Sequence, residues 1–253
     1  MATLTHLYRY PVKGLSAEPL TRVRLAAGEC LPLDRRLALA RPDSPFDPTH
    51  PVWLRKTHFL MLMRDERLAS LDVGYDDAER RLCVREGDRV MVDADLETPE
   101  GRDEVEAFFE TFMGPSLGGR PRLVEAEGHV FTDSPTRYLS LINLATVAEI
   151  GCAVGRPVHH LRFRANIYVD GLAAWAEFDW VGREVAPDGG GARLEGAARI
   201  DRCAATEVEP GTGTRDLNLP QALRRHFGHI ECGIYLRAVQ DGELVLGQTL
   251  APA

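Results

Sequence analysis

The chain has 253 residues and a mass of 28.0 kDa, which is enough to bury a sizeable hydrophobic core without a stabilising metal or disulfide. Its formal net charge of -8 at pH 7 argues against general attraction to nucleic acid or to an anionic membrane, although a local basic pocket is compatible with it. The five cysteines are scattered, odd in number and without a CxxC pair, so a disulfide framework is not expected.

The beginning of the chain carries no sign of export. The segment MATLTHLYRYPVKG lacks the apolar centre of a signal peptide, and no run approaches the roughly 20 apolar residues that a membrane-spanning helix needs. We therefore expect a cytoplasmic protein that acts neither on nucleic acid nor in a membrane.

The first part of the chain is rich in short strands. Apolar runs between Gly, Pro and Asp turns predict strands at residues 6–12, 22–25, 35–40, 59–63, 68–73, 81–85 and 89–94. The run FLMLM at 59–63 suits a strand buried on both faces or a barrel stave. Residues 41–58 contain four prolines and predict an irregular loop anchored by Phe46 and Trp53, of a length that is often functional.

A helical period replaces the strand pattern after residue 98. Thr98 is a suitable cap, Pro99 suits the first helical position, and phenylalanines recur at helical spacing until Gly114. The segment GPSLGGRP at 114–121 then indicates a hinge or boundary. We expect a first domain over residues 1–120 and a second over residues 121–253.

The second half returns to strands and adds two short helices. The pattern predicts strands at 122–127, 161–171 and 190–201, helices at 144–154 and 220–228, and a hairpin of strands at 233–239 and 243–250. Asn143 and Gly155 bound the first of these helices, and Asp241 with Gly242 would close the hairpin.

Two groups of polar residues in this half are candidates for binding an anion. Ser134, Ser140 and neighbouring hydroxyl groups precede a helix N-terminus, where ordinary capping chemistry explains them equally well. In the predicted strand at 161–171, alternation places Arg162, Arg164 and Asn166 on one face. That row suits a phosphate or a polar heterocycle, and it also suits a solvated barrel face.

Cys203 is the candidate centre of the chemistry. It lies at or just beyond the end of the strand predicted at 190–201, where a side chain can face a cleft, and Arg199 and Arg202 are close in the sequence. Cations near a thiol favour the thiolate, which attacks electrophiles and binds soft metals. The alternative is a small buried hydrophobic residue.

Five segments in order, YPVKG, LDRR, SPTRYLS, RFRAN and RCAATEVEPGTGTRDLN, resemble the MOSC superfamily with its N-terminal β-barrel domain. The resemblance covers nearly the whole chain and is closest to bacterial relatives of the mitochondrial amidoxime reducing component. It implies an α+β fold, mainly β, with two β-rich lobes, a MOSC-type β-barrel and a few short helices.

The resemblance also implies a cofactor and the residues that hold it. The cofactor is the molybdenum cofactor, a molybdopterin that carries molybdenum, and Cys203 matches the thiolate ligand of the metal and the catalytic position. The residues that would hold the phosphate and the pterin are Lys13, Arg35, Ser134, Ser140, Arg164 and Asn166.

The activity implied by the resemblance is reduction of a small N-hydroxylated compound to an amine or amidine plus water. Electrons would come from a separate donor protein, a reductase or an iron-sulfur or haem protein, because the chain has no four-cysteine pattern for an iron-sulfur cluster. Phe178 follows Glu177 where relatives often carry an acid, so Glu177 and Asp179 both remain candidate proton donors.

Two other functions are compatible with the same residues. The first is a carrier that binds the cofactor or transfers its sulfur without reductase activity of its own. The second is an interaction module in which the thiol of Cys203 is merely buried, which predicts no metal and little effect of changing that residue.

Overall fold

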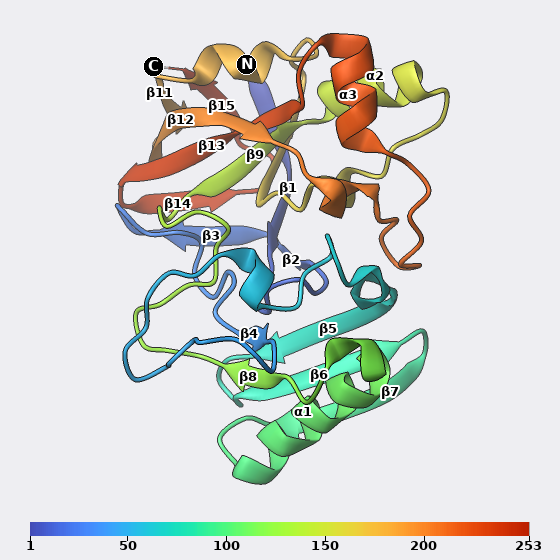
Figure 1. The fold of residues 1–253 in the computed structure, drawn as a ribbon. Helices are drawn as coiled ribbons and strands as arrows, with labels where there is room; N and C mark the ends of the chain where they lie inside the picture. Colours follow the sequence, from blue (N-terminus) through green and yellow to red (C-terminus); the bar gives the residue numbers. More distant parts are fainter. Residues whose placement is uncertain (253) are drawn as a thin grey trace.

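Seven strands close into a β-barrel in the upper half of Figure 1. The structure is a computed structural model that describes residues 1–252. The barrel strands are β1 (Ala2–Arg9), β9 (Leu139–Asn143), β10 (Ile167–Asp170), β11 (Glu184–Pro187), β12 (Arg193–Asp201), β13 (Glu231–Gln240) and β15 (Thr249–Pro252). Around the barrel they follow the order β10, β9, β13, β12, β11, β15 and β1, and the pairing of β1 with β10 closes the ring.

The pairing of β1 with β10 is antiparallel and contains a bulge. Leu4 lies opposite Val169 and Leu7 opposite Ile167, with the register shifting between Leu4 and His6. Residues three apart on a strand point to opposite faces, so both leucines can enter the barrel only because the bulge adds one residue. All four side chains belong to the buried cluster that fills the barrel, which fixes the register.

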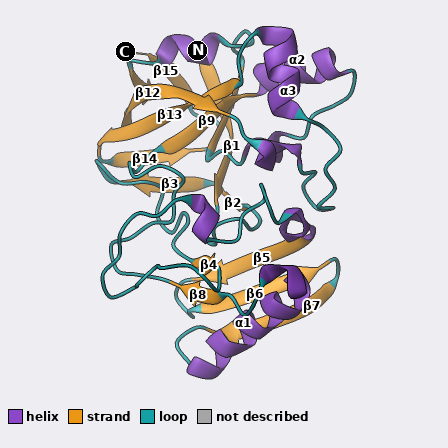
Figure 2. Cartoon of the chain, viewed as in Figure 1, coloured by secondary structure: helices purple, strands orange, loops and turns teal. Residues whose placement is uncertain are grey.

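A second β-rich unit lies below the barrel in Figures 1 and 2. It consists of a three-stranded antiparallel sheet, a two-stranded sheet and one long helix, which share a core that includes Val73, Val105 and Phe109. Its elements are β4 (Ala38–Ala40), β5 (Leu71–Asp76), β6 (Arg81–Glu86), β7 (Arg89–Asp95), β8 (Arg122–Val124) and α1 (Pro99–Met113).

The remaining elements surround the barrel. They are β2 (Glu18–Leu20), which pairs with β1, the two-stranded sheet of β3 (Arg22–Leu25) and β14 (Gly242–Val245), and the helices α2 (Leu144–Val154) and α3 (Leu219–Phe227). No helix within residues 1–252 is both long and apolar enough to cross a bilayer.

The fold is mainly β with three α-helices in the part of the chain that the structure describes, which confirms the predicted fold class. Side-chain caps begin each helix as the sequence indicates: Thr98 accepts from the amide of Gly101, Asn143 from Ala145 and Asn218 from Gln221. The domain division at residue 120 stays a prediction. β1 and β3 lie in the predicted first domain, yet they pair with β10 and β14 of the predicted second domain.

The prediction of a strand at 59–63 is wrong, although its burial is right. Phe59 makes only an isolated bridge to Ala40, and the chain turns at Met61, whose carbonyl accepts from the amides of Arg64 and Asp65. The carboxylate of Asp65 accepts from the amide of Met61 at 2.9 Å and pairs with buried Arg41. Asp65, which lies just after the segment and is held by Arg41, therefore determines the conformation of the segment.

The predicted strand at 161–171 is wrong in its first half. Residues His160–Phe163 form a 3-10 turn, η4, and Arg164 has a left-handed backbone with φ of 51° before β10 begins. Arg162 is turned toward acidic residues of another loop. Arg162, Arg164 and Asn166 consequently do not share one face of a strand.

The predicted hairpin closed by Asp241 and Gly242 is also wrong. β14 pairs with β3, and β13 pairs with β12 and β9. Asp241 accepts a hydrogen bond from the amide of Ala27 at 2.8 Å, and the amide of Gly28 donates to Ala238. These contacts bring the turn after β3 to the end of β13, so β14 continues along β3.

We expect Gly196→Ala to destabilise the barrel by about 1–3 kcal/mol, because its new methyl group would lie 2.0 Å from the carbonyl oxygen of Trp180. Chemical denaturation measures the change. Gly74→Ala, in β5 with open space around the new carbon, is the matched control and should change stability by less than about 0.5 kcal/mol. Equal effects of the two changes would contradict the close approach.

Candidate functional site

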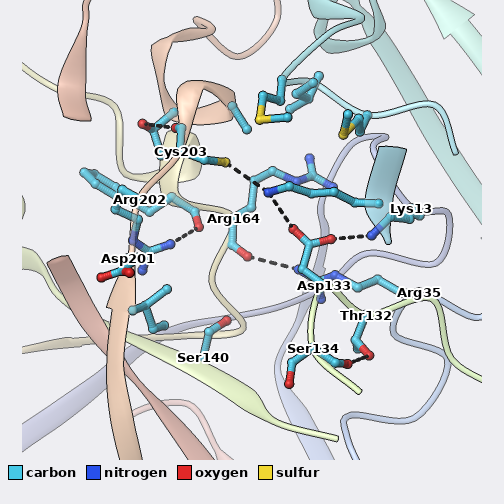
Figure 3. A pocket seen from close by; sticks show the side chains of 18 of the residues that line it. Lys13, Arg35, Thr132, Asp133, Ser134, Ser140, Arg164, Asp201, Arg202 and Cys203 are labelled. Carbon is cyan, nitrogen blue, oxygen red and sulfur yellow. Dashed lines mark hydrogen bonds and ion pairs between the residues drawn. The ribbon is translucent and has the colours of Figure 1, made fainter. Parts of the chain in front are cut away.

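A cavity of about 340 Å³ lies where the barrel meets the second unit (Figure 3). Residues of both units line it, including Lys56 and Met61 from the second unit and Ile200 and Tyr235 from the barrel. The structure brings all seven predicted site residues to this cavity: Lys13, Arg35, Ser134, Ser140, Arg164, Asn166 and Cys203. Their roles stay predictions, whereas their common location is a feature of the fold.

Cys203 follows the last residue of β12 by two positions, as the sequence predicts. It precedes the 3-10 turn η6 (Ala204–Glu207), and its carbonyl oxygen accepts from the amide and the hydroxyl group of Thr206 at 3.0 and 2.9 Å. The half-buried side chain accepts a hydrogen bond at Sγ from Nζ of Lys56, at 3.3 Å (Figure 3).

The cation beside the thiol is therefore Lys56 and neither of the two arginines that are close in sequence. Arg199 is exposed, stacks on Phe178 and pairs with Glu231. Arg202 lines the cavity but donates to the carbonyl oxygens of Phe163 and Cys232. The sequence analysis missed Lys56, and the one signal for it was its place in the long proline-rich loop.

A carboxylate, Asp133, lies between two lysines. It forms an ion pair with Lys13 and accepts from Nζ of Lys56 at 3.4 Å, while Lys13 also donates to the carbonyl oxygen of Phe131 at 2.9 Å. Burial opposes ionisation of Asp133, but the two ammonium groups outweigh it and lower the pKa of this carboxyl. Burial lowers the pKa of Lys13, and Asp133 counteracts part of that effect.

Burial also opposes the charge on Lys56. Asp133 and the sulfur of Cys203 outweigh burial and raise the pKa of Lys56, so this lysine is an ammonium group at neutral pH. The sequence analysis missed Asp133 as well, although it is adjacent to Ser134 in the SPTRYLS segment.

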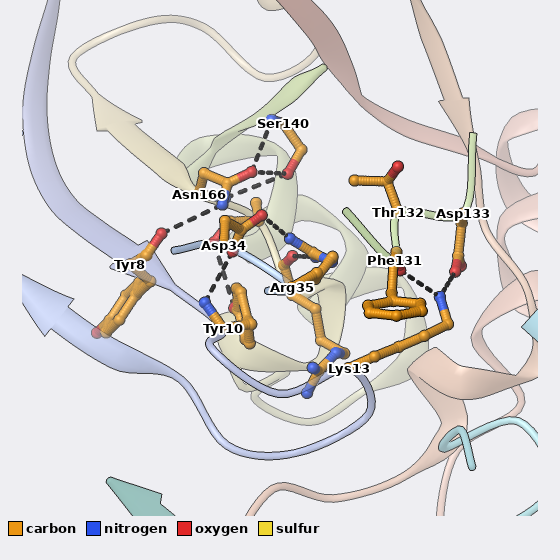
Figure 4. A network of polar contacts seen from close by, with 12 residues as sticks. Tyr8, Tyr10, Lys13, Asp34, Arg35, Phe131, Thr132, Asp133, Ser140 and Asn166 are labelled. Atoms are coloured by element: carbon orange, nitrogen blue, oxygen red, sulfur yellow. Dashed lines mark hydrogen bonds and ion pairs between the residues drawn. The ribbon is translucent and has the colours of Figure 1, made fainter. Parts of the chain in front are cut away.

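Two guanidinium groups that line the cavity stack on one tyrosine ring. Those of Arg35 and Arg164 lie 4.9 and 4.4 Å from the ring centre of Tyr10. Both arginines have left-handed backbone conformations, with φ of 52° and 51°, which are uncommon for residues other than glycine. Asp34 pairs with Arg35 and accepts from the amide of Tyr10 at 2.7 Å (Figure 4).

The guanidinium of Arg164 has no hydrogen-bond or ion-pair partner among residues 1–252. Burial lowers the pKa of Arg164, and the charge of Arg35 acts in the same direction. Arg164 is half-buried, and a cation that is partly removed from water without a counterion favours an anionic ligand.

Asn166 uses its side chain within the protein. Its Oδ1 accepts from the amide and hydroxyl group of Ser140 at 3.1 and 3.0 Å, and its Nδ2 donates to the carbonyl oxygen of Tyr8 at 3.2 Å (Figure 4). Ser134 accepts from the amide of Thr136 at 3.1 Å. Asn166 and Ser140 thus hold the β9 strand beside the chain that leads into β10, which positions Arg164.

Arg162, in the turn η4 before β10, connects that turn to the loop that follows Cys203. Its side chain is 1% exposed, pairs with Glu209 and Asp216, and donates to the carbonyl oxygen of Glu207 at 2.9 Å. The two carboxylates balance the charge of Arg162. This arginine is therefore not available to an anionic ligand, as the predicted row of Arg162, Arg164 and Asn166 required. The same contacts fix the Cys203 loop.

Neither predicted proton donor lines the cavity. Glu177 is fully buried and accepts from Asn143 and Thr146 at 3.1 and 2.9 Å, and burial raises its pKa. Asp179 is exposed. The carboxylates that do line the cavity are Asp133 and Asp201.

The charges of the cavity fit an anionic group that carries a soft metal. Six cationic side chains and two carboxylates line it, in a protein whose overall charge is negative. Among the residues that the structure describes, no cluster of three His, Cys, Asp or Glu side chains could hold a bare metal ion. A single thiol with more cations than carboxylates around it suits a metal that arrives within its own anionic ligand.

The family model of the MOSC domain matches residues 128–251. The chain contains a MOSC domain. The MOSC family binds the molybdenum cofactor. β1 lies outside the matched residues, yet it completes the barrel of this MOSC domain and leads directly to Lys13.

Two solved structures are similar to the chain. The YuaD protein from Bacillus subtilis shares 14% identity at a TM-score of 0.47, with 98% of this chain and 93% of that chain covered. YiiM from Geobacillus stearothermophilus shares 18% identity at a TM-score of 0.36, with 46% of this chain and 53% of that chain covered. No curated protein matches the sequence.

We expect Asp133→Asn to reduce stability at neutral pH and to matter less in acid. A carboxyl whose pKa is lowered by folding stabilises the native state above its unfolded pKa of about 3.9, and loses that contribution as the pH falls further. Chemical denaturation at about pH 6 and about pH 3 measures the difference between the variant and the original protein. The control is Asp43→Asn, which changes an exposed carboxylate. If Asp133→Asn lowered stability by the same amount at both pH values, the ion pairs of Asp133 with Lys13 and Lys56 would not stabilise the protein.

Proposed function

We propose that the protein is a molybdenum-cofactor-dependent oxidoreductase that reduces small N-hydroxylated compounds. The observation that supports this most is the combination, in one cavity of a MOSC domain, of a thiol with an excess of cations that includes the unpartnered Arg164. Electrons come from a separate donor protein, and the reaction takes place in the cytoplasm.

Each side chain has a part in this proposal. Arg164, Arg35 and Lys13 hold the anionic part of the cofactor, with Ser134 and Ser140 as hydrogen-bonding groups. Asn166 positions Ser140 and the chain that carries Arg164. Cys203 provides the protein ligand, a soft sulfur donor of the kind that molybdenum accepts.

When bound, the cofactor supplies two-electron reduction of an N–O bond. The balance requires two electrons and two protons for each N-hydroxylated molecule, which gives an amine or amidine and one water. We assign the relay of protons from solvent to Asp201, because Glu177 and Asp179 lie away from the cavity and the two lysines keep Asp133 ionised. The apolar side chains of Met61 and Leu62, which line the same cavity, limit the access of water.

Cys203→Ala should abolish turnover of an N-hydroxylated substrate, since it removes the ligand sulfur. The protein is produced in a host that makes the cofactor, molybdenum and pterin are quantified, and turnover is driven by a chemical reductant. Cys152→Ala, at an exposed cysteine, is the control and should behave as the original protein. Bound cofactor without turnover in the original protein would favour the carrier function, and the absence of cofactor would contradict both.

Arg164→Met should weaken retention of the cofactor by about 10–100-fold, because it removes charge-assisted hydrogen bonds to an anion. Molybdenum that remains after extensive dialysis measures the effect. Arg199→Met, which removes an exposed cation of β12 that does not line the cavity, is the control. Unchanged retention in Arg164→Met would show that the anion lies elsewhere in the cavity.

A further inference from the structure

Lys56 joins the two units of the protein across the cavity. Its ammonium group lies 3.3 Å from Sγ of Cys203 and 3.4 Å from Oδ2 of Asp133, and the side chain is 28% exposed. Cys203 is 147 residues further along the chain, at the end of a barrel strand. The thiol of the MOSC domain thus has a cationic hydrogen-bond donor that comes from outside the domain.

The loop that carries Lys56 is fixed at several points. Lys56 begins the 3-10 turn η1 (Lys56–His58), and the carbonyl oxygen of His58 accepts from the amide of Arg41 at 2.9 Å. Trp53 donates from Nε1 to the carbonyl oxygen of Thr132 at 3.2 Å, which ties the loop to the segment of Asp133. The direction of Lys56 is therefore set by a side-chain contact before it, at Trp53, and a backbone contact after it, at His58.

A hydrogen bond to a ligand sulfur changes the properties of the metal that the sulfur holds. Reduction adds negative charge to the centre, and a fixed positive charge next to the sulfur stabilises the reduced form more than the oxidised form. Asp133 moderates the charge of Lys56 without neutralising the site, because it is shared with Lys13.

We propose that Lys56 is a positioning residue that donates a hydrogen bond to the sulfur of Cys203 and thereby raises the reduction potential of the molybdenum centre. The inference rests on the proposed function, because it requires the cofactor to be bound through Cys203. It adds a role for a residue of the proline-rich loop in the chemistry of the MOSC domain.

The experiment compares four variants of the cofactor-loaded protein. Lys56→Met removes both charge and donor, Lys56→Gln keeps a neutral donor, and Lys56→Arg keeps charge and donor. Arg55→Met removes the same charge from an exposed neighbouring residue and controls for net charge. The readouts are molybdenum content, the midpoint potential from a redox titration followed by electron paramagnetic resonance, and thermal stability.

We expect a lower midpoint potential in Lys56→Met, a smaller decrease in Lys56→Gln, and potentials close to the original in Lys56→Arg and Arg55→Met. Turnover in Lys56→Met should fall by about 10–100-fold, the usual effect of removing a partner of a metal ligand. If Lys56→Met retains too little molybdenum for titration, Lys56→Gln provides the comparison.

Equal potentials in the original protein, Lys56→Met and Lys56→Gln would overturn the inference and leave the proposed function intact. So would equal decreases in Lys56→Met and Arg55→Met, because they would indicate an effect of net charge. An original protein that binds no molybdenum would instead overturn the proposed function, and with it the role of Lys56.

Discussion

The pairing of β1 with β10 is the contact on which the rest of the site depends. It closes the barrel, and it also places the chain that follows β1 next to the chain that precedes β10. The amide of Tyr8 donates to the carbonyl oxygen of Asn166 at 2.8 Å, and the hydroxyl group of Tyr10 donates to that of Ala165 at 3.2 Å. Arg35 and Arg164 meet over the ring of Tyr10 because the amide of Arg35 donates to the carbonyl oxygen of Tyr10, and Tyr10 is hydrogen-bonded to Ala165, the neighbour of Arg164.

The arginines around the cavity have different roles, which depend on their hydrogen-bond partners. Arg162 and Arg202 are both buried, and carbonyl oxygens or carboxylates of the protein occupy the terminal nitrogens of both guanidinium groups. They hold loops in place. Arg164 is two residues from Arg162, and its donors are left for a ligand. An acidic protein can thus maintain a cationic cavity, because the cost of burying these charges is offset by packing, shared carbonyls and stacking on Tyr10.

Local patterns predicted much of the fold. Caps and glycines defined α1 and α2, and the position of Cys203 after a strand followed from alternation along β12, because these signals depend only on neighbouring residues. The errors at 59–63, at 161–166 and at β14 have a common cause. In each case a distant partner, Arg41, Asp216 or β3, determined the backbone, and periodicity does not contain that information.

The candidate site, like the fold, could be predicted only in part from the sequence. The residues named from the resemblance to MOSC proteins all line one cavity, whereas Lys56 and Asp133 were not anticipated. Lys56 is in a loop of a different unit, so its distance to the thiol of Cys203 follows only from the tertiary structure. Proximity in sequence favours Arg199 and Arg202 as the cations beside the thiol, but successive side chains at a strand end point in different directions.

Closure of the barrel by its first strand also has a consequence for synthesis on the ribosome. The hydroxyl group of Thr5 donates to the carbonyl oxygen of Tyr168, 163 residues further along the chain, so β1 emerges long before its partner strand exists. Until then its apolar face and its backbone donors are open to other contacts, and contacts between such distant residues form slowly. The nascent chain therefore has to protect this edge for most of its translation, and the cavity between the two units can assemble only after the barrel has closed.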